Sequence, residues 1–196
     1  MGVDSHHPQM TRERLDEWRL MRDASDGESA VKAASTATTG VSVTARDKSY
    51  LPMPGGFKAQ SDQGAAMYAA YKGRAQFPEI VAPSISAMVG IVHAKDITIE
   101  LPPGLEYLWE RATADGLDLE SFHRRITRQL LTFGRYGVLT DADTNGGNPF
   151  LCGYSAETII NWDGESFYVL DESGYERSGF EWVRQSKYRV LQIWVG

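Results

Sequence analysis

The sequence has one cysteine and no long hydrophobic run. Cys152 alone cannot form an internal disulfide, nor a zinc site built from several cysteines. No apolar stretch approaches the ~20 residues that a membrane-spanning helix needs. The N-terminus is polar and lacks the apolar segment of a signal peptide. These absences predict a soluble protein of a reducing compartment that does not bind a membrane.

Basic residues are also in the minority. Lys and Arg number 20 against 26 Asp and Glu, which gives a net charge of −6. General nucleic-acid binders are usually basic, so this balance argues against that class, although it is compatible with a channel wall along which DNA slides. The two Gly-Gly pairs, at 55–56 and 146–147, lack the Lys-Ser/Thr of a phosphate-binding loop, which argues against a P-loop ATPase.

The rest of the composition is typical of a globular domain. With 42% hydrophobic residues among 196, the chain can build one substantial core, which corresponds to one domain or slightly more. Five tryptophans are spread along the chain, as expected of core anchors and not of a platform on which bases stack. They are Trp18, Trp109, Trp162, Trp182 and Trp194.

The clearest local pattern is a helix between residues 118 and 134. Asp118 is a good N-cap, because its carboxylate can accept a hydrogen bond from a first-turn N–H, and Gly134 suits the left-handed conformation that ends helices. Spacings of four, four and three place Phe122, Ile126, Leu130 and Phe133 in one apolar stripe. We expect this stripe to be buried, so that Leu130→Ala would destabilise the fold by roughly 2–5 kcal/mol.

Other elements follow from periodicity and turn residues. After the central helix we expect strands at 137–140 and 151–154, separated by a loop at 141–147, then strands at 167–170 and 188–195. Before it we expect a helix capped by Thr11, a short helix at 28–34, a Ser/Thr/Ala-rich linker at 35–44, a helix capped by Asp62, a helix with Pro83 in its first turn, a strand at 97–101 and a helix over 105–112.

These elements predict an α+β fold, in which a helix-rich N-terminal part is followed by a mixed, mostly antiparallel sheet. Residues 1–60 would form an arm of short helices with the linker, and residues 61–196 an α+β domain. The chain stops on an apolar strand with nothing to cover its edge, so we expect it to be an incomplete part of a longer protein.

Two motifs resemble catalytic or metal sites only in part. Asp141, Asp143, Asn145 and Gly146 match the start of a calcium loop, but its twelfth position is Cys152 and not a bidentate glutamate. An acidic hairpin loop is therefore the favoured interpretation, and we expect no metal or other cofactor.

Ser155 lies in G-Y-S-A-E, which lacks the last glycine of the G-x-S-x-G nucleophile motif. His123 and Asp141 are possible triad partners, but their spacing does not support that role. We expect Ser155 to cap a turn that begins at Ala156. The adjacent His6 and His7 do not have metal-ligand spacing, and His93 is expected to interact with free carbonyls at a helix end.

Four arginines form the only dense basic cluster: Arg124, Arg125, Arg128 and Arg135. They can contact a phosphate backbone, form the solvated face of a helix, or pair with an acidic neighbouring subunit. The negative net charge favours the last two interpretations over DNA contact.

Several short motifs follow one another in order along nearly the whole chain. They are His7-Pro8; a W-x3-RD-x3-G-x2-AVKAA stretch with Trp18, Arg22, Asp23, Gly27 and residues 30–34; YLP at 50–52; Tyr71 with Arg74 and Ala75; VG-x-V-x-x-K at 89–95; LLTFGRYGVLTD at 130–141; and YSAETIINW at 154–162. In this order they resemble a family of phage portal proteins that was long catalogued only as a domain of unknown function. Residues 35–48 are longer than the family pattern, and family members continue well past residue 196.

The resemblance implies the N-terminal arm and much of the wing of a portal, which has no active site and no cofactor. Portals form rings, typically of twelve subunits, at one capsid vertex of the virion, and they assemble in the host cytoplasm. Double-stranded DNA passes through the ring during packaging and ejection. Implied partners are other copies of the chain, terminase, head-completion or adaptor proteins and the major capsid protein. The alternatives are a small cytoplasmic hydrolase built around Ser155 or the 141–147 loop, and an interaction module.

Overall fold

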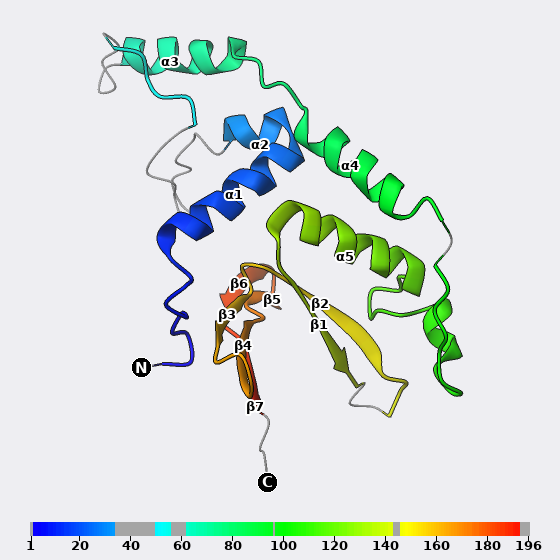
Figure 1. The fold of residues 1–196 in the computed structure, drawn as a ribbon. Coiled ribbons are helices and arrows are strands. Elements are labelled where there is room, and N and C mark those ends of the chain that lie inside the picture. The colour runs from blue at the N-terminus through cyan, green and yellow to red at the C-terminus, as the bar shows by residue number, and fades with distance from the viewer. Residues whose placement is uncertain (1, 34–49, 56–61, 96, 143–145, 193–196) are drawn as a thin grey trace. The chain divides into compact units, whose positions relative to one another are not determined.

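The computed structural model describes residues 2–33, 50–55, 62–95, 97–142 and 146–192. Within them, helices occupy the N-terminal part and antiparallel strands follow (Figure 1), so the predicted α+β class is confirmed. The chain divides into two compact units, Met1–Trp18 with Val89–Gly196 and Arg19–Met88. The division into an arm (1–60) and a wing-like domain (61–196) uses other boundaries and stays a prediction. No helix in the described ranges is long and apolar enough for a membrane span.

Four α-helices precede the central one in the described residues. They are α1 (Arg12–Asp26), α2 (Glu28–Ala33), α3 (Asp62–Arg74) and α4 (Val81–Val92). Thr11 caps α1 as predicted, since its hydroxyl oxygen accepts a hydrogen bond from the Arg14 backbone N–H at 3.3 Å. Pro83 lies in the first turn of α4, where its missing N–H costs nothing. The predicted linker at 35–44 and the side chain of Asp62 lie outside the described residues.

Polar contacts at helix ends link parts of the unit of residues 19–88. Glu79 Oε1 accepts a hydrogen bond from the backbone N–H of Glu28, at the start of α2 (2.9 Å). Lys32 donates to the carbonyl of Gly73 at the end of α3 (3.1 Å). Both contacts satisfy backbone groups at helix ends, which have no partner within the helix. This unit also has an apolar hollow of about 240 Å³, lined by residues such as Leu20, Leu51 and Phe77.

Two predictions before residue 118 are wrong. Residues 97–101 form no strand, because their alternating pattern finds no partner strand in the described part of the chain. The expected helix over 105–112 is only a short 3-10 helix, η1 (Glu106–Trp109). Ala112 and Thr113, a few residues after η1, are buried and do not continue a helix. They pair with Leu151 of the next strand region, whose N–H donates to the Ala112 carbonyl.

The central helix α5 (Leu119–Phe133) begins and ends as predicted. The Asp118 carboxylate accepts a hydrogen bond from the Ser121 N–H at 2.7 Å, and Gly134 takes a φ of 74°. The predicted stripe is only partly right. Phe122 and Phe133 are 1% and 9% exposed, but Leu130 is 46% exposed.

Gln129 takes the inward position that was expected of Leu130. Residues 129 and 130 both lie about one turn after Ile126, so a 3.6-residue repeat permits either to continue the buried stripe. Gln129 is half-buried, and its Oε1 is buried without a hydrogen-bond partner in the described residues. The residues that face inward, Phe122, Ile126, Gln129 and Phe133, are therefore spaced by four, three and four positions.

The strands of the described residues form three antiparallel sheets. The first pairs β1 (Tyr136–Asp141) with β2 (Phe150–Ser155), as predicted, and places Leu139 opposite Cys152. The second has the order β3-β4-β7, with β3 (Ile159–Trp162), β4 (Phe167–Asp171) and β7 (Tyr188–Gln192). The third is a hairpin of β5 (Gly174–Ser178) and β6 (Glu181–Gln185), which we did not predict.

The core of the strand region joins the first two sheets. Tyr154, Ile159 and Leu170 form one buried cluster, and Leu139, Cys152, Trp162, Tyr168 and Leu191 pack against it. Gly137 lies so close to Ile159 that a Cβ atom would approach the Ile159 side chain to 3.0 Å. A glycine at this position therefore lets β1 approach Ile159 on β3 closely. Arg135, just before β1, lies against the ring of Trp162 at the end of β3.

Candidate functional site

Arg135 is the centre of the most elaborate group of side chains in the described residues. Its Cζ lies 5.0 Å from the ring centroid of Trp18 and 4.5 Å from that of Trp162. Its Nη2 donates hydrogen bonds to the backbone carbonyls of Ala156 and Ile159. A guanidinium between aromatic faces is held by cation–π attraction, which strengthens as water is removed. Arg135 thus joins α1, the α5–β1 turn and β3.

The N-terminal segment completes this group. His7 stacks on Trp162 with ring centroids 4.0 Å apart and an interplanar angle of 16°, and its backbone N–H donates to the Ile160 carbonyl at 2.8 Å. Trp18 is 6% exposed, and its Nε1 donates to the Phe133 carbonyl at 3.1 Å. We call His7, Trp18, Arg135 and Trp162 the arginine stack.

Among the described residues, the arginine stack has no carboxylate partner for its charge. No ion pair to Arg135 is found in the described part of the chain, and carbonyl oxygens and ring faces surround the guanidinium instead. Burial, with a smaller effect from the nearby Arg14, lowers the pKa of Arg135. An arginine nonetheless keeps its charge in proteins, so this group is a permanent cation that joins separate segments.

The other three predicted arginines do not join Arg135 in one basic patch. Arg124 pairs with Glu120 one turn earlier on α5 (2.7 Å), and Arg125 pairs with Asp115 (3.1 Å). Arg128 is exposed on the same helix. Two of the cations are thus neutralised locally, as the solvated-face interpretation expects. A role in subunit or DNA contact stays a prediction.

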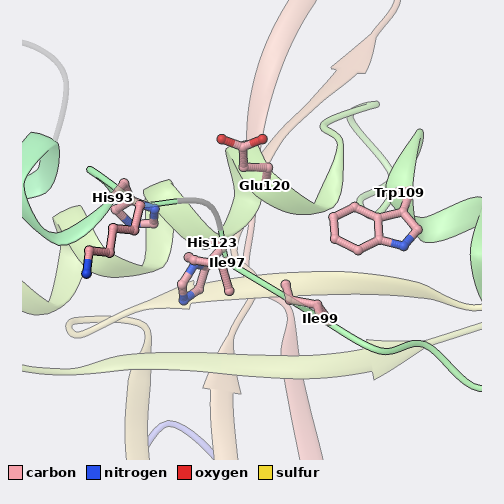
Figure 2. Close-up of a pocket in the computed structure, with 7 residues that line it drawn as sticks. His93, Ile97, Ile99, Trp109, Glu120 and His123 are labelled. Atoms are coloured by element: carbon pink, nitrogen blue, oxygen red, sulfur yellow. The ribbon is translucent and has the colours of Figure 1, made fainter.

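A pocket of about 120 Å³ lies beside α5. Figure 2 shows two histidines at one end and Trp109 at the other. The rings of His93 and His123 meet edge to face, with centroids 4.9 Å apart, and a ring nitrogen of His93 bonds to the Thr127 hydroxyl at 2.9 Å. The pocket is lined by His93, Lys95, Ile97, Ile99, Trp109, Glu120 and His123.

This histidine pocket does not fit a metal centre. The described residues include no group of three His, Cys, Asp or Glu side chains that could hold a metal ion, and Glu120 is already paired with Arg124. Our expectation that the His93 ring binds free helix carbonyls is wrong. The backbone N–H of His93 closes the end of α4 by donating to Val89, while its ring bonds to Thr127.

His93 should make stability fall at mildly acid pH. Burial, followed by the nearby charges of His123 and Arg124, lowers the pKa of His93 below its usual 6.5. The unfolded chain therefore takes up a proton at a higher pH than the folded chain. Stability is complete above about pH 6.5 and declines as pH falls toward the folded pKa.

The measurement is the unfolding temperature of the wild type and of His93→Asn between about pH 7 and pH 5. As the pH falls over this range, the unfolding temperature of the wild type should decrease more than that of the variant. His6→Asn, a change at an exposed histidine, should behave like the wild type. Parallel curves for the wild type and His93→Asn would show that His93 does not titrate in this range.

Ser155 has none of the surroundings of a nucleophile. Its hydroxyl makes no hydrogen bond to a histidine or carboxylate in the described residues. Its backbone carbonyl accepts bonds from the N–H and the hydroxyl of Thr158, at 3.1 and 3.0 Å. Ser155 thus closes the turn between β2 and β3, which begins at Ala156, through its backbone carbonyl.

Asp141 has a structural role in a charged network between sheets. Its carboxylate pairs with Arg189 on β7 at 2.6 Å, and Arg189 Nε also pairs with Glu172 at 2.6 Å. Tyr154 donates its hydroxyl hydrogen to Glu172 at 2.7 Å. The hydrogen bond from Arg189 holds the pKa of Asp141 below its usual range, so this carboxylate stays ionised and paired.

We expect calcium not to bind the 141–147 loop. Asp143 and Asn145 lie outside the described residues, but the carboxylate of Asp141 is already paired with Arg189. Calorimetry with millimolar calcium, the weak end of known calcium loops, should therefore give no binding heat. A saturable one-site isotherm that Asp141→Ala abolishes would contradict this expectation.

The tryptophans divide into two classes. Trp18 is buried and Trp162 is half-buried, as expected of core anchors. Trp109 and Trp182 are 40% and 68% exposed, so for them that expectation is wrong. Trp194 lies outside the described residues.

No protein-family model matches this chain, and no curated protein is significantly similar to it.

Proposed function

We propose that this chain is a structural part of a phage or prophage portal ring at the capsid vertex, which forms the DNA passage for genome packaging and ejection. The observation that carries the proposal is the arginine stack. His7, Trp18, Arg135 and Trp162 come from four separate motifs of the portal-like pattern, and they meet in one group. Their contacts give those motifs a common structural reason to occur together.

The proposal makes the protein non-enzymatic. It is supported by the surroundings of the two candidate chemical groups. Asp141 is paired with Arg189, and the Ser155 hydroxyl has no base bonded to it among the described residues. In this proposal the partners are other copies of the chain, terminase, head-completion or adaptor proteins, the major capsid protein and double-stranded DNA.

Deletion of the gene from its phage or prophage tests the proposal. Capsids should then assemble without packaged DNA, and mass spectrometry of normal particles should detect the protein. Electron microscopy of the product of the natural reading frame should show a ring with a central opening. Normal DNA packaging by the deletion strain, or a protein absent from purified particles, would overturn the portal proposal.

The competing hydrolase interpretation gives a separate prediction. A serine-reactive phosphonate probe should not label the purified protein, because no histidine or carboxylate in the described residues is hydrogen-bonded to the Ser155 hydroxyl as a base. The control is Ser155→Ala, which should give the same background labelling as the wild type. Stoichiometric labelling that Ser155→Ala removes would favour an enzyme.

A further inference from the structure

The tip of the β5–β6 hairpin presents one aromatic side chain to solvent. Among the described residues the two strands form a sheet of their own, and all ten of their residues are exposed. A two-residue turn joins them, in which Gly179 has a φ of 64° and Phe180 is 98% exposed. A positive φ at the first turn residue alone indicates a type II′ turn, which matches the twist of the strands. Phe180 is therefore held at the end of a regular hairpin.

The exposure of Phe180 has no explanation in the packing of the described chain. No large hydrophobic side chain in the described ranges is more exposed, and the next in rank, Ile91, is 75% exposed. A side chain that is 98% exposed contributes almost nothing to the core of its own chain. Aromatic residues that leave water at a contact between proteins contribute much of the binding energy and are enriched at the centre of interfaces. Phe180 is thus placed to act on a partner.

The apolar hollow described above has the size and the lining of a site for such a ring. Its volume is about 240 Å³, and an apolar cavity of roughly 150 Å³ is already large enough for benzene. Side chains of α1, of α2 and of the segment after α3 line it, among them Leu20, Val31 and Phe77. Tyr50 also lines it, and its hydroxyl donates to the Asp23 carboxylate at 2.8 Å. This polar group therefore needs no hydrogen bond from an occupant.

The charges around the tip and the hollow are complementary. The described lining of the hollow includes two lysines and no acidic residue. Lys32 pairs with Glu28 on the same helix, so Lys72 is the cation that an incoming carboxylate would meet. Glu181 follows the tip residue directly. Because successive residues of a strand alternate between faces, the strand register puts Glu181 and Arg177 on opposite faces of the hairpin. The tip can therefore enter with its acidic face toward Lys72.

We propose that Phe180 of one copy inserts into the hollow of a second copy, with Glu181 beside Lys72. The contact joins two different surfaces, so each copy gives one tip and receives another. Such a contact continues head to tail and closes into a ring when the rotation between neighbours permits it. The inference rests on the proposed function, because it names one contact between neighbouring subunits of the portal ring.

The size of the tip limits the strength of this contact. One aromatic residue buries about 150–250 Å², whereas a stable interface buries about 800 Å² on each partner. The tip and the hollow alone therefore give weak association that increases with protein concentration. Other surfaces must add to this contact in a closed ring.

Two variants that each lack one half of the contact test it. Sedimentation velocity over a concentration series should show association of the wild type that is lost in Phe180→Ala, which removes the tip, and in Ala75→Phe, which fills the hollow from its lining. An equimolar mixture of the two variants should form pairs and nothing longer, because one variant supplies only the tip and the other only the hollow. Ile91→Ala, which truncates another exposed apolar side chain, should associate like the wild type.

A second hollow variant keeps the test valid if Ala75→Phe does not fold. Leu20→Glu, at a residue that is 46% exposed, puts a carboxylate in the lining that repels Glu181, and it should replace Ala75→Phe in every comparison. A wild type that stays monomeric at the highest concentration would overturn the inference, as would Phe180→Ala that associates like the wild type. A mixture that stays monomeric or grows beyond pairs would also contradict it. None of these results changes the outcome of the gene deletion, so a failed tip contact is distinguishable from a failed portal proposal.

Discussion

Arg135→Ala should lower the free energy of unfolding by about 3 kcal/mol. The substitution removes the charged donor to the carbonyls of Ala156 and Ile159 and leaves a gap between Trp18 and Trp162. Hydrogen bonds from a charged group contribute about 1.5–3 kcal/mol each, and a desolvated cation–π contact about 2. The lower desolvation cost of alanine offsets part of this loss.

Chemical denaturation followed by tryptophan fluorescence measures this effect. Arg124→Ala is the matched control, since it removes an exposed ion pair with Glu120 on the same stretch of chain and should cost less than about 0.5 kcal/mol. The cost of Arg135→Lys should lie between the costs of Arg135→Ala and Arg124→Ala. Lysine keeps the charge, but its ammonium is a point charge that does not reproduce the planar guanidinium. Equal costs for Arg135→Ala and Arg124→Ala would show that the stack contributes little to stability.

Phe122→Ala should cost about 3–5 kcal/mol. Phe122 is 1% exposed and lies on the inward face of α5, so its truncation leaves a cavity that the surrounding side chains fill only in part. Leu130→Ala, on the same helix, should cost less than about 1 kcal/mol because 46% of Leu130 remains exposed.

This pair of variants separates the two possible stripes of α5. Thermal or chemical unfolding of both should give a large shift for Phe122→Ala and a small one for Leu130→Ala. A cost of several kcal/mol for Leu130→Ala would show that Leu130 is covered in solution. The stripe predicted from the sequence would then be correct after all.

Local signals were sufficient to predict several elements. The α5 caps at Asp118 and Gly134 depend on the conformational preferences of those residues, so sequence alone identifies them. The β1–β2 pair follows from two apolar runs on either side of a Gly/Asn/Asp loop. Whether Gln129 or Leu130 faces inward depends on what packs against α5. The helical repeat permits both, so the sequence pattern alone does not decide between them.

The β5–β6 hairpin shows a different kind of failure. Its turn has a glycine at the first of two positions, which is a recognised hairpin signal, and polar and aromatic residues surround it. We did not predict it because neither strand has the alternation of a half-buried strand. That alternation reports burial on one face, and both faces of this hairpin are exposed.

The candidate site was the hardest part to predict. Each member of the arginine stack belongs to a motif visible in the sequence, yet the sequence interpretation grouped Arg135 with the exposed arginines of α5. Burial of its guanidinium depends on contacts with Trp18 and Trp162, which lie far from it in the chain. The His93–His123 contact, between residues thirty apart, was missed for the same reason.

The arginine stack also makes the protein an optical reporter of its own N-terminal segment. Indole emission depends on its immediate surroundings, and Trp162 is in stacking contact with His7 while Trp18 faces the same guanidinium. Release of residues 2–10 would expose Trp162 to water without moving β3. A red shift of the emission, without loss of the far-ultraviolet circular dichroism of the strands, would then record this release in unlabelled protein.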